Sequence, residues 1–127
     1  MSALILDAGA FVGVDRNDRA VLARLAAAQR NGLELRTNSM VVAQVWRDRQ
    51  GRQANLARLL QAVKVQPIGD QEGREAGALL GQTGTADAID ATVVLLAHPG
   101  DRILTSDPDD LTKLAEAAKC RAVVVAC

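Results

Sequence analysis

The sequence predicts an α/β fold, a three-layer α/β/α sandwich around a mostly parallel five-stranded sheet. Residues 3–6 (ALIL) and 121–126 (RAVVVA) are short apolar runs typical of buried strands. Amphipathic helical patterns alternate with such runs, and the connections between them are short. With 127 residues, 49% of them hydrophobic, we expect one hydrophobic core and hence one domain over residues 1–127.

The first half of the chain contains two predicted strands and two predicted helices. The strand at 3–6 ends at Asp7, and a helix follows at 19–32 with Asp18 as its N-cap and Gly32 at its end. Residues 33–37 form a half-exposed strand. A helix begins at 39, capped by Asn38 or Ser39, and ends near Gly51.

The second half continues the alternation. The predicted elements run in the order helix, strand, helix, helix, strand, helix, strand, at residues 53–63, 64–68, 71–84, 86–98, 102–106, 108–119 and 121–126. Asp70 caps the helix at 71–84, Thr85 starts the helix at 86–98, and Pro99 with Gly100 ends it. Asp107 and Pro108 suit the N-cap and N1 positions of the last helix.

The composition excludes some function classes. The chain has one Phe, one Trp and no Tyr, so the stacking platforms of single-strand binders are not expected. Net charge is zero, but it is uneven. Four arginines (Arg47, Arg49, Arg52 and Arg58) lie within twelve positions, and six aspartates lie between 87 and 110. The basic segment could hold a phosphate backbone and the acidic segment a metal ion, or both could be solvated faces of the protein.

The sequence indicates a cytoplasmic protein. Cys120 and Cys127 form neither a disulfide framework nor a metal motif. The first ten residues lack the basic region of a signal peptide, and we expect no membrane segment.

Two aspartates directly follow predicted strands. The carboxyl ends of parallel strands share one edge of the sheet, so Asp7 and Asp107 are expected there. Helix capping alone explains either residue. However, carboxylates gathered at one edge repel each other unless a cation lies between them.

Asp87 and Asp90 open the apolar helix TADAIDATVVLLA. Their i,i+3 spacing puts both carboxylates on one helix face. Asp87 is explained by the helix dipole, whereas Asp90 lies one turn deeper among apolar residues. A buried carboxylate needs a cation, a partner or a cavity, so Asp90 is the strongest functional candidate.

Other chemistries are less well supported. His98 is the only histidine, so no histidine pair can bind zinc, and glycine-rich phosphate loops are absent. A phosphoryl-transfer enzyme of the haloacid-dehalogenase type also begins with a strand ending in Asp. That class needs a second Asp where this chain has Gly9, and a lysine that Lys64, Lys113 and Lys119 do not match.

These motifs together resemble a PIN-domain ribonuclease of the small VapC-like kind found in toxin–antitoxin pairs. The resemblance rests on LILDAGA, SMVVAQVWRD, DATVVLLA and ILTSDPDDL, in that order, and covers most of the chain. It implies an acidic pocket that binds Mg²⁺ or Mn²⁺. Asp7, Asp90 and Asp107 match the metal-binding acids, Asp87 matches an extra catalytic acid found in some members, and Asp110 is a further contributor.

Two positions depart from the family pattern. Gln44 stands where a glutamate is usual, with Asp48 as a substitute one turn further, and Ala8 replaces a Ser or Thr. The resemblance implies metal-dependent hydrolysis of RNA, with phosphates gripped by the arginine segment. It also implies a small antitoxin partner and a homodimer. The alternative is a PIN-like RNA- or partner-binding module with weak or no nuclease activity.

Overall fold

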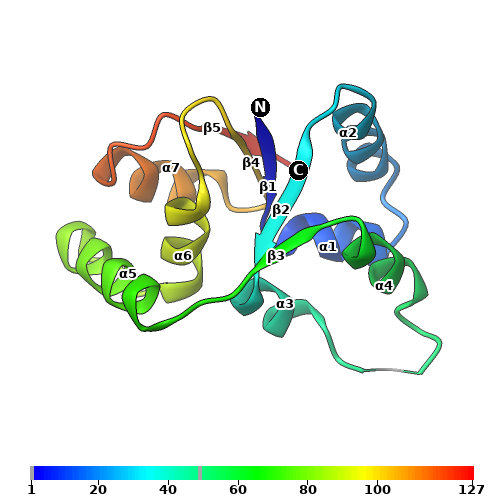
Figure 1. Cartoon of the computed structure of the whole chain (residues 1–127), viewed down its shortest axis with the longest axis horizontal. Helices are drawn as coiled ribbons and strands as arrows, with labels where there is room; N and C mark the ends of the chain where they lie inside the picture. The colour runs from blue at the N-terminus through cyan, green and yellow to red at the C-terminus, as the bar shows by residue number, and fades with distance from the viewer. Residues whose placement is uncertain (1, 49) are drawn as a thin grey trace.

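The protein is described by a computed structural model covering residues 2–48 and 50–127 (Figure 1). Within these residues the five strands are β1 Ala3–Leu6, β2 Glu34–Asn38, β3 Lys64–Gln66, β4 Arg102–Thr105 and β5 Val123–Ala126. The helices are α1 Ala8–Asp15, α2 Arg19–Arg30, α3 Ser39–Val45, α4 Ala54–Gln61, α5 Asp70–Thr83, α6 Ala88–Leu96 and α7 Pro108–Ala117.

The strands form one sheet in the order β3-β2-β1-β4-β5, and every neighbouring pair is parallel. Figure 1 shows α5, α6 and α7 together on one face of the sheet and α1, α2 and α4 on the other. Helix α3 lies at the carboxyl end of β2, where it packs against α1 and α6. The predicted α/β/α sandwich with a five-stranded sheet is confirmed.

The core lies on both sides of the central strand β1. All four residues of β1 are buried, as the continuous apolar run predicts. Phe11 of α1 and Ile103 of β4 are fully buried beside it. The edge strand β3 is exposed throughout, in keeping with its short length.

Helix α1 was not predicted. Its sequence, AGAFVGVD, contains two glycines and is apolar on nearly every face, so it lacks the 3.6-residue alternation that marks an amphipathic helix. It forms because its apolar residues are buried between the sheet and neighbouring helices; Ala10, Phe11 and Val14 are in the core. Tertiary burial therefore overrides the weak local propensity.

Several predicted helix boundaries are wrong. Asp70 is the first residue of α5 and not its cap, since Gly69 occupies the N-cap position. Helix α3 ends at Val45, not near Gly51, because the buried amide of Gln53 donates to the Val45 carbonyl and accepts from the Arg47 N–H. Helix α6 begins at Ala88 with Asp87 as its N-cap, so Thr85 lies outside it. None of the helices in the described ranges combines the length and hydropathy of a membrane-spanning segment.

Candidate metal centre

The candidate site lies at the carboxyl edge of the sheet. Asp7 follows β1, and its N–H donates to the Leu104 carbonyl at the end of β4 (3.0 Å). Asp107 follows β4 and begins α7, while α6 passes alongside. Parallel pairing of β1 with β4 thus brings residues a hundred positions apart to one edge, as predicted.

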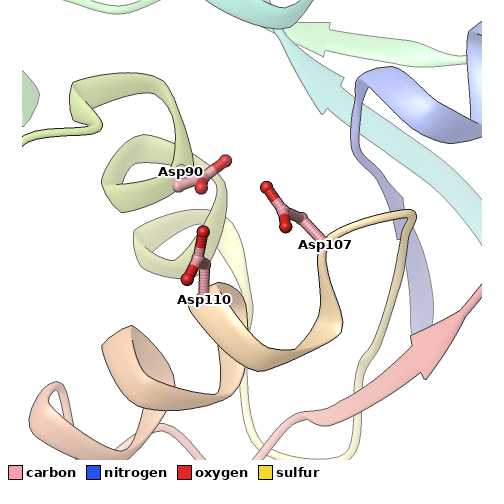
Figure 2. A group of neighbouring side chains, drawn as sticks. All are labelled: Asp90, Asp107 and Asp110. Carbon is pink, nitrogen blue, oxygen red and sulfur yellow. The ribbon is translucent and has the colours of Figure 1, made fainter.

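Three carboxylates meet at this edge. One oxygen from each of Asp90, Asp107 and Asp110 lies within 4.8 Å of the other two. Figure 2 shows Asp90 reaching out from α6 toward Asp107 and Asp110 at the start of α7. Asp90 and Asp107 are therefore brought together as expected, and Asp110, named only as a further contributor, is a full member of this group.

Asp90 is the buried member. Its exposed fraction is 6%, and its Oδ2 atom has no hydrogen-bond partner among the described residues. Burial raises the pKa of its carboxyl group to about 7, and the nearby carboxylates of Asp87, Asp7, Asp107 and Asp110 add to the rise. A buried carboxylate with an unpartnered oxygen lowers the stability of the fold unless a cation binds to it.

Asp107 does not use its side chain to cap α7. It occupies the N-cap position before Pro108, but its carboxylate accepts no capping hydrogen bond. The side chain is exposed, and its pKa is raised chiefly by the neighbouring Asp110 carboxylate. The capping explanation therefore does not account for this residue, and its oxygens stay available to a ligand.

Asp7 is buried beside the group but is not one of its three members. It stands at the N-cap of α1, yet its carboxylate makes no capping bond. Instead, Oδ2 of Asp7 accepts a hydrogen bond from the Thr105 hydroxyl (2.7 Å), and the same hydroxyl oxygen accepts from the Asp107 N–H (3.0 Å). Thr105 thus connects two of the predicted acids.

Thr105→Val should weaken both the fold and the site. The hydroxyl is fully buried, so its loss leaves an oxygen of Asp7 and the Asp107 N–H without their partner. We expect the free energy of unfolding to fall by about 1–3 kcal/mol. Urea denaturation measures this change, with Thr105→Ser, which keeps the hydroxyl, as the matched control. Equal losses in the two variants would contradict this role of the hydroxyl.

Asp87 shapes the site from the start of α6. Its side chain is exposed, and Oδ1 accepts from the Asp90 N–H (3.0 Å). It is therefore the N-cap rather than a first-turn residue, and it holds the backbone of Asp90 in place. Its carboxylate also raises the pKa of Asp90.

No acid from α3 joins the three carboxylates within the described residues. Gln44 lies on α3 with its side chain exposed, and it carries no charge. Asp48 does not lie one helical turn beyond it, because α3 has already ended at Val45 and Asp48 adopts a positive φ of 52° in the following loop.

The arginine segment is divided between different environments. Arg47 donates to the carbonyls of Ala43 and Trp46, so it closes the end of α3. Arg58 borders a separate groove between α2 and α4, and Arg52 is exposed. Arg49 lies outside the described residues. A phosphate-gripping role for the whole segment stays a prediction.

The donor set suits a hard divalent cation. The three group members offer only carboxylate oxygens, the ligands that Mg²⁺ and Mn²⁺ prefer. The orphaned oxygen of Asp90 provides one ligand that protein groups do not otherwise satisfy. The cluster can therefore hold a divalent ion.

Sequence reasoning missed the connecting role of Thr105. No local pattern indicates this role, because the bond from Thr105 to Asp7 spans 98 positions and depends on strand register. The signal for Asp110 was present in its i,i+3 spacing from Asp107.

The fold is similar to that of a solved chain. The match is to a chain of VapBC2 from Rickettsia felis, in a crystal structure bound to a DNA fragment from their promoter. The TM-score is 0.72 at 12% sequence identity, and the alignment covers 98% of each chain. No family model and no curated protein matches the sequence. The likeness confirms the PIN-like, VapC-like fold that the sequence motifs predict.

Proposed function

We propose that the protein is a metal-dependent endoribonuclease that hydrolyses RNA phosphodiester bonds, in the manner of a VapC-like toxin. The observation that carries this proposal is the meeting of Asp90, Asp107 and Asp110 at the carboxyl edge, with a buried oxygen of Asp90 left unpartnered. Capping and ion pairing explain neither of the first two side chains.

In this mechanism Asp90, Asp107 and Asp110 would hold one Mg²⁺ or Mn²⁺, with Asp7 contributing from the end of β1. The ion, when bound, would supply Lewis-acid polarisation of the scissile phosphate and would lower the pKa of water. The protein's own residues keep this arrangement in position. Thr105 orients Asp7 and the backbone of Asp107, and Asp87 secures the start of α6.

The proposal is tested by RNA cleavage. Purified protein is incubated with structured RNA and Mn²⁺, beside an Asp90→Asn variant and a variant of the exposed acid Asp109, Asp109→Asn. We expect cleavage by wild type and Asp109→Asn, and a loss of about 100-fold or more in Asp90→Asn. Equal cleavage by all three proteins, or none by wild type, removes the nuclease proposal.

The second candidate function is an RNA- or partner-binding module with weak or no activity. Its support is the neutral Gln44 on α3, which leaves the three-carboxylate group without an acid from that helix. Ala8 also removes a hydroxyl next to Asp7. RNA binding by wild type without cleavage in the assay above is the result that this function predicts.

The likeness to VapBC2 also supports an antitoxin partner. We propose that a small protein of this kind covers the acidic group, that the chain forms a homodimer, and that it acts on RNA in the cytoplasm. Co-purification with the product of an adjacent reading frame tests the partner.

A further inference from the structure

A hollow of about 360 Å³ lies between the starts of α1 and α2 and the end of β4. Ala8 and Gly9, which follow Asp7, form part of its wall, and Ser106, which precedes Asp107, forms another part. The hollow is therefore bordered by the immediate chain neighbours of two acids. Its volume lies within the range of roughly 300–1,000 Å³ that ligand pockets occupy.

Small residues allow this hollow to form. An ideal Cβ on Gly9 would lie 2.5 Å from Oγ of Ser106, so α1 can begin this close to the end of β4 only with glycine. Gly13, further along α1, makes a similar approach to Val21 of α2, where a Cβ would lie 2.7 Å from a methyl group. Val12, Gly13 and Val21 make part of the wall apolar, which suits contact with a ribose or a base.

Arg16, at the end of α1, supplies positive charge to the lining of the hollow. Its side chain is exposed, it follows the last residue of α1, and it has no ion pair among the described residues. Asp18, which also lines the hollow, already accepts hydrogen bonds from the N–H groups of Ala20 and Val21. Its charge is partly compensated by the start of α2.

The distance along α1 matches a neighbouring phosphate. Asp7 and Arg16 flank the eight-residue helix, and a rise of 1.5 Å per residue over the nine steps between them separates their backbones by roughly 13–14 Å. An arginine side chain shortens this gap and can grip a phosphate through its planar fork. An RNA strand whose scissile phosphate lies at the acids of the candidate metal centre would then place one nucleoside in the hollow.

We infer that this hollow is a subsite for one nucleotide of a single-stranded RNA substrate, and that Arg16 binds the phosphate beyond it. The inference rests on the proposed function. Apolar walls without an aromatic side chain predict contact with any base rather than selection of one. Arg16 is thus a binding residue and not a metal ligand.

Fluorescence anisotropy with labelled poly(U) tests this subsite. Ca²⁺ replaces Mg²⁺ as a hard, oxygen-binding cation, and affinity is measured over a series of NaCl concentrations. For Arg16→Gln we expect Kd to rise roughly three- to tenfold. We also expect the slope of log affinity against log salt to decrease by about 0.7, the value for one phosphate contact on a single strand.

Two variants serve as controls. Arg16→Lys keeps the charge and should keep the wild-type salt slope. Arg30→Gln removes an exposed arginine from the end of α2, outside the hollow, and should leave both affinity and slope unchanged. Equal effects of Arg16→Gln and Arg30→Gln would overturn the subsite while leaving the nuclease proposal intact. RNA cleavage without any binding of poly(U) would also overturn it. A wild-type protein that neither binds poly(U) nor cleaves RNA would remove both proposals.

Discussion

Asp90→Asn is expected to stabilise the metal-free protein while it abolishes RNA cleavage. The carboxyl group of Asp90 has a pKa of about 7 in the folded chain, against an ordinary value of 3.8. The folded chain therefore holds this proton more tightly than the unfolded chain. Ionisation of Asp90 costs stability progressively as pH rises from 3.8 to about 7, and the full cost persists above that range.

The expected gain at about pH 8 is on the order of 1–3 kcal/mol, which is less than a full conversion at about 1.4 kcal/mol per pKa unit, because solvent at the edge of the site screens part of the cost. Asparagine removes the charge and keeps the shape, so the gain should disappear near pH 4, where Asp90 is protonated in both states. Urea denaturation over this pH range measures it, with Asp109→Asn as an exposed control expected to stay within about 0.5 kcal/mol of wild type. A wild type that is more stable than Asp90→Asn at alkaline pH without metal would contradict the unpartnered state of this carboxylate.

Asp101→Ala is expected to have the opposite effect, a loss of about 3–5 kcal/mol in the free energy of unfolding. Asp101 is as buried as Asp90, with 3% of its surface exposed, but its carboxylate is well partnered. It accepts from the N–H of Ala3 (2.8 Å) and of His98 (2.9 Å), and Arg36 lies 3.9 Å away. These contacts tie the start of β1 to the segment between α6 and β4.

Alanine would leave those donors buried without an acceptor. Urea denaturation at neutral pH measures the loss, and Asp109→Ala serves as the control for removing an aspartate. A loss below about 1 kcal/mol would show that Asp101 does not hold these segments together. Asp90 and Asp101 together show that burial alone does not mark a functional acid. Whether removal of the carboxylate stabilises or destabilises the protein depends on whether that carboxylate has hydrogen-bond partners.

This contrast also explains what the sequence could predict. Asp90 was recognisable because a carboxylate within an apolar helix is locally anomalous. Asp7 and Asp107 were recognisable because each ends an apolar strand. All three signals are local. The sheet and its parallel strands were predictable for the same reason, since β1 is a continuous apolar run and β4 contains the buried apolar pair Ile103 and Leu104.

The features that escaped prediction depend on contacts between distant segments. Asp101 looks like a loop residue until β1 lies beside β4, and Thr105 contacts Asp7 only through that register. The early end of α3 depends on Gln53, eight positions beyond Val45. Helix α1 has no amphipathic stripe in its sequence, and it forms through the tertiary burial of Ala10, Phe11 and Val14.

The central claim is that the acids at the carboxyl edge form a site that only a divalent cation completes. Its most direct test is the free energy of unfolding of wild type and Asp90→Asn at about pH 8, with and without Mn²⁺. Mn²⁺ should stabilise wild type strongly and the variant little. The higher free energy of unfolding that Asp90→Asn has without metal should therefore shrink or reverse when the ion is added. Unfolding of wild type that is insensitive to Mn²⁺, or that responds no more than Asp90→Asn does, would contradict the claim.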